Sequence, residues 1–106
     1  MKVSNLTSTR GNEVPNQFEI QTPTASYFQS YDSIIVKRER GGITYLDEHY
    51  WNYSKTTSKY RNLFLGETTK ETQQKIDAGV YILTDLNGTP SITTETSNIS
   101  TFKFFN

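Results

Sequence analysis

Residues 33–46 read SIIVKRERGGITYL, and this stretch predicts a β-hairpin. Ser33–Glu39 alternates its branched apolar residues between two faces, which is the period-two pattern of a strand. Ile43–Leu46 is again rich in strand-forming residues. Gly41 and Gly42 lie between the two runs and can take the positive φ angles that a tight hairpin turn requires. An antiparallel hairpin is therefore expected over this stretch.

Similar patterns outside this hairpin predict further strands and short helices. The expected strands are Gln17–Gln21, Ser26–Tyr31 and Val80–Leu83, with one short strand near Val3 in an otherwise irregular lead-in over residues 1–16. Helices are expected over 58–65, ending at Gly66, and over 69–78, started by the capping-box spacing of Thr68 and Glu71. The predicted fold class is α+β, with an antiparallel sheet of three to five strands and one or two short helices on one face. The expected core residues are Phe18, Ile20, Ile34, Val36, Leu63, Phe64, Ile76 and Ile82.

The length of 106 residues predicts a single domain, placed at residues 1–86. Hydrophobic residues make up only 33% of the chain, so the 7 tyrosines, 6 phenylalanines and 1 tryptophan are expected to supply much of the core. Residues 87–106 are rich in Thr and Ser and carry Phe102, Phe104 and Phe105. They are interpreted as a flexible tail or as one added edge strand over Thr101–Phe105.

Charge and cysteine content limit the functions and cellular locations that we expect for this protein. The formal net charge is zero, whereas dedicated duplex-DNA binders carry a clear basic excess. The chain has no cysteine, and neither a signal-type leader nor an apolar run of membrane-spanning length is apparent in the sequence. The expectation is a soluble intracellular protein with no membrane partner.

The chemistry-bearing residues do not form a familiar catalytic pattern. His49 is the only histidine, and without cysteine it cannot complete a zinc site of the usual ligands. A phosphate-binding loop and a nucleophile elbow are also missing from the sequence. We therefore expect no enzyme activity, no cofactor and no metal. A hydrolase using His49 with Asp47 or Glu48 is the weakest of the hypotheses considered.

Basic and aromatic residues alternate over residues 37–61, which is typical of a binding surface. Tyr, Trp and Arg dominate the energetics of protein interfaces, and the same residue types bind single-stranded nucleic acid through stacking and phosphate contacts. Burial of the rings in the core is the competing interpretation. The candidate binding residues are Lys37, Arg38, Arg40, Tyr50, Trp51, Tyr53, Lys59 and Arg61.

Several short motifs together resemble an uncharacterised family of small bacteriophage and mobile-element proteins, over roughly residues 3–87. They include Val3-Ser4-Asn5-Leu6-Thr7, Tyr27-Phe28-Gln29-Ser30-Tyr31, Lys59-Tyr60-Arg61, Phe64-Leu65-Gly66-Glu67 and Gly79-Val80-Tyr81. The resemblance implies an accessory protein in the host bacterial cytoplasm that binds a host protein, for example to inhibit a defence system. The alternative is single-stranded nucleic-acid binding through residues 37–61. The sequence does not predict an oligomeric state.

Overall fold

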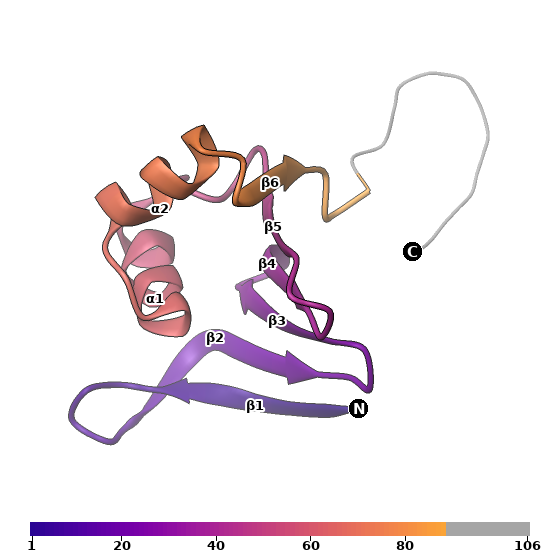
Figure 1. Ribbon diagram of the computed structural model, residues 1–106. Coiled ribbons are helices and arrows are strands. Elements are labelled where there is room, and N and C mark those ends of the chain that lie inside the picture. The colour runs from indigo at the N-terminus through magenta and orange to yellow at the C-terminus, as the bar shows by residue number, and fades with distance from the viewer. Residues whose placement is uncertain (89–106) are drawn as a thin grey trace, which may run out of the picture.

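The computed structural model describes residues 1–88, so most of the expected tail at 87–106 lies outside the described residues. Residues 1–88 form one six-stranded sheet and two helices (Figure 1). The elements in chain order are β1 (Lys2–Thr7), β2 (Glu13–Gln21), β3 (Ala25–Ser30), β4 (Ser33–Glu39), β5 (Thr44–Asp47), α1 (Lys55–Leu65), α2 (Thr69–Asp77) and β6 (Tyr81–Thr84).

The strand order in the sheet follows the chain order, and β1 to β5 form an antiparallel meander. β1 to β5 pair antiparallel, and β6 pairs parallel to β5 because α1 and α2 carry the chain back between them. The α+β class is confirmed. The expected size of three to five strands is wrong, since the sheet has six strands within residues 1–88 and is mixed rather than purely antiparallel.

The lead-in over residues 1–16 is not irregular, as the sequence suggested, but supplies β1 and the start of β2. The turn between them is closed by a hydrogen bond from the Ser8 amide to the Asn12 carbonyl at 2.8 Å, and Gly11 provides the positive φ of 85° that the turn requires. The polar side chains of β1 hide its strand period, while its backbone pairing with β2 stabilises it.

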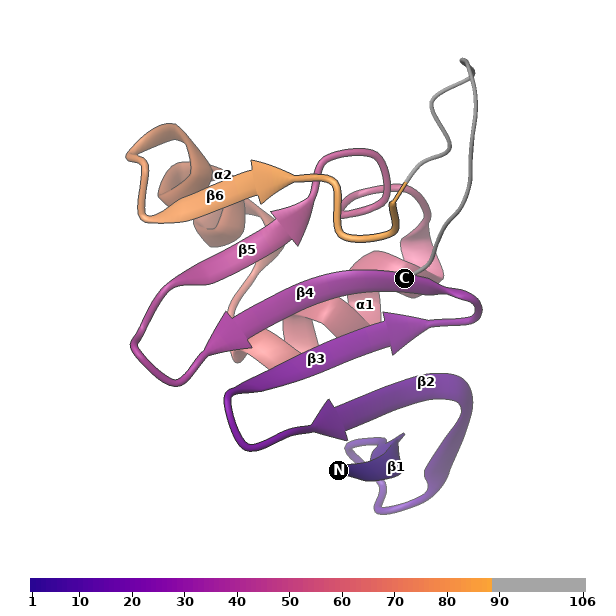
Figure 2. The same ribbon diagram turned by 90° about the vertical axis from the view of Figure 1, so that its right-hand side faces the viewer.

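Both helices begin at side-chain caps and lie on the same face of the sheet (Figure 2). Ser54 caps α1 by accepting a hydrogen bond from the Thr57 amide, so the helix begins three residues earlier than expected. Thr68 and Glu71 form the predicted capping box of α2. Gly66, in the left-handed conformation, ends α1 and turns the chain into α2.

The core lies between the helices and the centre of the sheet. Phe28, Val36 and Leu46 are fully buried there, and the ring of Phe64 in α1 stacks on Phe28 with 5.8 Å between centroids. A β-bulge in β4 places Ile35 as an extra residue between the partners of Phe28 and Gln29. Ile35 is therefore buried in the same core as its neighbour Val36, against the alternation expected from the sequence.

The predicted core residues divide between the two faces of the sheet. Val36 is buried, and Phe64 and Ile76 pack against the core. Leu63 and Ile82 are exposed, which corrects their assignment to the core. The remaining three are half-buried, and their strand register places them on the face opposite the helices: Phe18, Ile20 and Ile34.

Candidate binding surface

The basic–aromatic residues predicted from the sequence are distributed over several parts of the molecule. Lys37 points to the sheet face opposite the helices, whereas Arg38 points to the helix face and its guanidinium lies 5.0 Å from the Phe64 ring centroid. Arg40 lies in the β4–β5 turn, and its guanidinium Nη2 is 3.5 Å from the carbonyl oxygen of Thr22. Tyr50 and Trp51 are half-buried against the core, Tyr53 is 71% exposed, and Lys59 lies over Tyr60 on α1. The fold does not bring these residues together into one continuous surface.

Arg61 lies inside the protein, although the sequence placed it among the surface cations. Its side chain is fully buried, and its guanidinium lies 5.1 Å from the Trp51 ring centroid. It donates hydrogen bonds to the Trp51 carbonyl oxygen, to the side chains of Ser58 and Asn62, and to the Thr69 hydroxyl at 2.8 Å. Burial lowers the pKa of Arg61, and the negative charge of Glu67 opposes that shift. Arg61 therefore joins the turn before α1 to the start of α2.

The residues of the weak hydrolase hypothesis occupy different environments. Asp47 is fully buried, and its carboxylate accepts backbone hydrogen bonds from His49, Tyr50 and Leu86 and a side-chain hydrogen bond from Asn87. His49 lies outside on the surface, 3.6 Å from Glu48. Within residues 1–88 no three His, Cys, Asp or Glu side chains gather closely enough to hold a metal ion.

A second group of interacting polar side chains joins the turn between the helices to α2 and β6. The Glu67 carboxylate has a side chain only 5% exposed and accepts hydrogen bonds from Lys75 at 2.7 Å, Tyr81 at 2.9 Å and Thr72 at 2.6 Å. Burial alone would raise the pKa of Glu67, but these hydrogen bonds together hold it below the ordinary value. Both carboxylate oxygens are occupied, so the network is interpreted as a structural link rather than as a catalytic site.

This network predicts how stability depends on pH. Because the folded-state pKa of Glu67 is depressed, its contribution is fully present above the unfolded-state pKa of about 4.3 and is lost as the pH falls through the folded-state value. Urea unfolding measured from pH 7 down to pH 2 should show a Glu67-dependent loss of stability below about pH 4.5. In Glu67→Gln this loss should be smaller, from a lower starting stability. In the exposed control Glu71→Gln, the loss of stability at low pH should remain. An identical pH profile for Glu67→Gln and the wild type would contradict the stabilising role assigned to Glu67.

The sheet face opposite the helices carries an unexpected row of apolar side chains. Within residues 1–88 no helix covers this face, which is turned toward the viewer in Figure 2. The strand pairings connect one residue from each strand into a row that crosses the whole sheet. From β1 to β6 this cross-strand row is Val3, Ile20, Tyr27, Lys37, Tyr45 and Ile82.

A second row, in which apolar and amide side chains alternate, adds two apolar residues along the first four strands. It joins Asn5, Phe18, Gln29 and Ile34 by the same pairings. We call the two rows together the open face. An antiparallel sheet normally presents polar side chains on its solvated face, so this composition indicates a surface that another molecule covers.

The charges on the open face nearly cancel. Lys37 lies 3.4 Å from the carboxylate of Glu39, on the same strand and the same face. Its ammonium group is also 5.7 Å from the ring centroid of Tyr45. The surface therefore combines aromatic and aliphatic side chains with one paired cation, rather than with free positive charge.

Sequence reasoning did not find the open face, and it assigned four of its members to the core: Phe18, Ile20, Ile34 and Ile82. The period-two pattern of Phe18 and Ile20 shows that they share a face, but it does not show which face the helices cover. Tyr27 and Tyr45 lie in different strands, and their alignment depends on register across β4.

Comparison with known proteins gives one match. A family model described as a family of unknown function (DUF8033) matches residues 1–79, and the chain belongs to this family. The matched residues include β1 to β5 and both helices, and thus every open-face residue except Ile82. The chain matches no curated protein and no solved structure. In the part of the chain that the structure describes, neither helix is both long and apolar enough to cross a membrane.

Proposed function

We propose that this member of a family of unknown function is a non-enzymatic binding protein whose open face docks another protein. The observation that carries the proposal is the apolar cross-strand row, which exposes Val3 to 55% and Ile82 to 43% at its two ends and has two tyrosines between them. Tyrosines in a partly desolvated apolar surround are typical of interface hot spots. The expected partner presents a largely apolar surface with few charges.

The electrostatics of the open face favour a protein partner over a nucleic acid. Nucleic-acid binding gains most of its affinity from cations that neutralise phosphates. The cross-strand row offers one cation, Lys37, which already interacts with Glu39 and with the ring of Tyr45. A protein surface needs no such excess of positive charge.

Single-stranded nucleic acid is the second candidate because Tyr27 and Tyr45 flank Lys37 on an open sheet. Exposed sheet aromatics can stack on unpaired bases. Fluorescence anisotropy with labelled DNA and RNA oligomers at low salt separates the two functions. Saturable binding that is lost in Tyr27→Thr and weakened by salt would replace the protein-binding proposal.

The biological setting is part of the proposal and comes from the resemblance described above. It places the protein in the cytoplasm of a bacterial host, as a bacteriophage or mobile-element accessory protein that binds a host protein. Inhibition of a host defence system is the specific role proposed for that interaction.

The open-face proposal predicts a selective loss of affinity. Once a partner has been captured from bacterial cells and identified, Tyr27→Thr and Tyr45→Thr should each weaken binding at least tenfold by calorimetry, because hot-spot truncations cost about 2 kcal/mol or more. Threonine keeps the β-propensity of these positions. The matched control is Tyr53→Thr, a more exposed tyrosine outside the open face, which should bind like the wild type. Loss of binding in Tyr53→Thr alone would instead assign the interaction to the turn before α1.

A further inference from the structure

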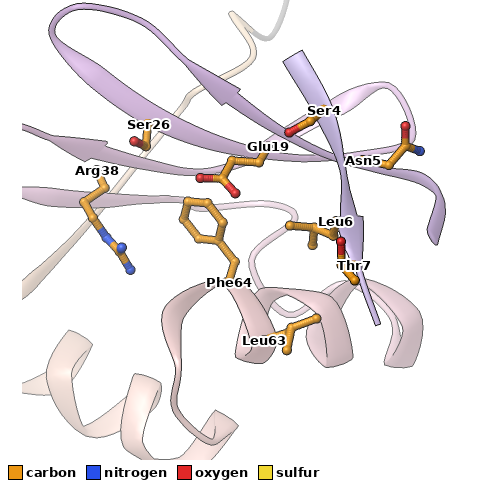
Figure 3. Close-up of a pocket in the computed structure, with 9 residues that line it drawn as sticks. All are labelled: Ser4, Asn5, Leu6, Thr7, Glu19, Ser26, Arg38, Leu63 and Phe64. Carbon is orange, nitrogen blue, oxygen red and sulfur yellow. The ribbon is translucent and has the colours of Figure 1, made fainter. Parts of the chain in front are cut away.

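A groove on the helix face, opposite the open face, brings a cation, an anion and apolar side chains together. It has a volume of about 390 Å³ and is lined by β1, by facing residues of β2, β3 and β4, and by the end of α1. This volume lies within the range of small-molecule pockets. Figure 3 shows the ring of Phe64 beside Arg38 and Glu19, while Thr7 lies next to Leu6 at the other end of the groove.

Arg38 is held in a position from which it can bind an anion. Its guanidinium carbon lies 5.0 Å from the Phe64 ring centroid. Stacking on a ring occupies the face of a guanidinium and leaves the N–H donors at its edge free for a planar acceptor such as a carboxylate. Within residues 1–88 these donors make no hydrogen bond or ion pair, although the side chain lines the groove.

Glu19 gives the same groove a negative charge that Arg38 does not neutralise. The two residues both line the cavity, yet no ion pair within 4.0 Å joins them in the described chain. One carboxylate oxygen of Glu19 accepts a hydrogen bond from Gln21 at 2.8 Å, which leaves the other oxygen for a ligand. Opposite charges kept apart in one cleft complement a ligand that carries both charges.

The apolar part of the groove completes the set of contacts. Phe64, Leu6 and Leu63 supply its hydrophobic wall beside the two charged side chains. A ligand with a short aliphatic side chain would cover these groups, while its charged ends reach Arg38 and Glu19. Serine and threonine hydroxyls around the cavity can satisfy its remaining polar atoms.

We propose that this groove binds a zwitterionic amino acid with an aliphatic side chain, its carboxylate on Arg38 and its ammonium group on Glu19. The inference is independent of the proposed function, because Arg38 and Glu19 lie on the sheet face opposite the open face, and the two surfaces share only Asn5 of β1. A variant that loses one interaction therefore leaves the other testable.

The test uses three matched probes with the full chain. L-leucine carries both charges, L-leucinamide lacks the carboxylate, and 4-methylpentanoate lacks the ammonium group. In ¹H–¹⁵N NMR titrations, L-leucine should give saturable shifts at the amides of residues 4–7 and 64, with a dissociation constant on the order of 1 mM. Each of the other probes should bind at least tenfold more weakly, since a charge-assisted hydrogen bond contributes about 1.5–3 kcal/mol.

Variants of Arg38 and Glu19 test the assigned roles. Arg38→Gln should abolish the shifts with L-leucine, and Glu19→Gln should bind 4-methylpentanoate as tightly as L-leucine, because the partner of the ammonium group is gone. The spectra of both variants without ligand report whether the fold is intact, and Arg38→Lys provides a second variant that keeps the positive charge. Equal binding of L-leucine and 4-methylpentanoate to the wild type, or unchanged L-leucine binding in Arg38→Gln, would overturn the proposal.

Discussion

Replacing Arg61 with alanine is expected to lower the free energy of unfolding by about 3–5 kcal/mol, which is a large part of the stability of a domain of this size. The substitution removes a fully buried side chain that stacks on Trp51. It also leaves the Trp51 carbonyl oxygen without its donor, while the Thr69 hydroxyl retains only the hydrogen bond donated by Asn62. A buried acceptor without a partner costs about 1–3 kcal/mol, and the cavity adds to that cost.

Urea unfolding followed by circular dichroism measures this effect. Arg61→Lys should give an intermediate loss, because lysine retains the charge but cannot reproduce the planar fork that reaches Trp51 and Thr69 together. Lys70→Ala, an exposed basic residue of α2, is the control and should change stability by no more than about 0.5 kcal/mol. A similarly small change in Arg61→Ala would show that Arg61 does not link the helices. Arg61 would then again be a candidate for ligand binding.

Replacing Asp47 with asparagine should cost about 2–4 kcal/mol, although the two side chains have nearly the same shape. Both oxygens of the Asp47 carboxylate accept hydrogen bonds, one from the amides of His49 and Tyr50 and the other from Leu86 and Asn87. An asparagine must turn its NH₂ group toward one of these pairs of donors. The substitution therefore disrupts either the turn after β5 or the segment after β6.

Hydrogen exchange distinguishes a local loss of structure from global destabilisation in this variant. In Asp47→Asn, the amide of either Tyr50 or Leu86 should lose protection, depending on which pair of donors faces the NH₂ group, and the unfolding midpoint in urea should fall. Glu48→Gln is the matched control, because Glu48 is exposed and its pairing with His49 is a surface contact. Retention of wild-type protection at both amides would contradict the assigned role of Asp47.

Local signals in the sequence predicted the parts of the fold that depend on neighbouring residues. The hairpin of β4 and β5 followed from the Gly41-Gly42 turn, and α2 followed from the capping box of Thr68 and Glu71. These features need only contacts within a few residues, so the pattern of residue types is sufficient to specify them.

The remaining features depend on long-range pairing, which a single sequence does not specify. The polar strand β1 is stabilised by its pairing with β2, and β6 joins the sheet only because two helices return the chain to β5. The bulge at Ile35 changes the face of a residue without any change in composition. Each of these depends on the register of strands.

The candidate binding residues show the same difference between what local sequence and long-range pairing determine. Proximity in the sequence grouped Arg38, Trp51 and Arg61, but the fold places Arg38 in a groove, Trp51 against the core and Arg61 inside the protein. The open face has the opposite character, because its members are separated along the chain and meet only through strand pairing. A surface made of one residue from each strand has no compact signal in the sequence.

Site-specific photo-crosslinking tests the open-face claim most directly. A benzophenone amino acid replaces Tyr27, Tyr45, Tyr53 or the exposed Gln73 of α2, one position at a time, and each variant is irradiated with the captured partner. The proposal predicts cross-links to the partner from positions 27 and 45, and none from positions 53 and 73. Cross-links from position 53 or 73 with none from positions 27 and 45 would contradict it.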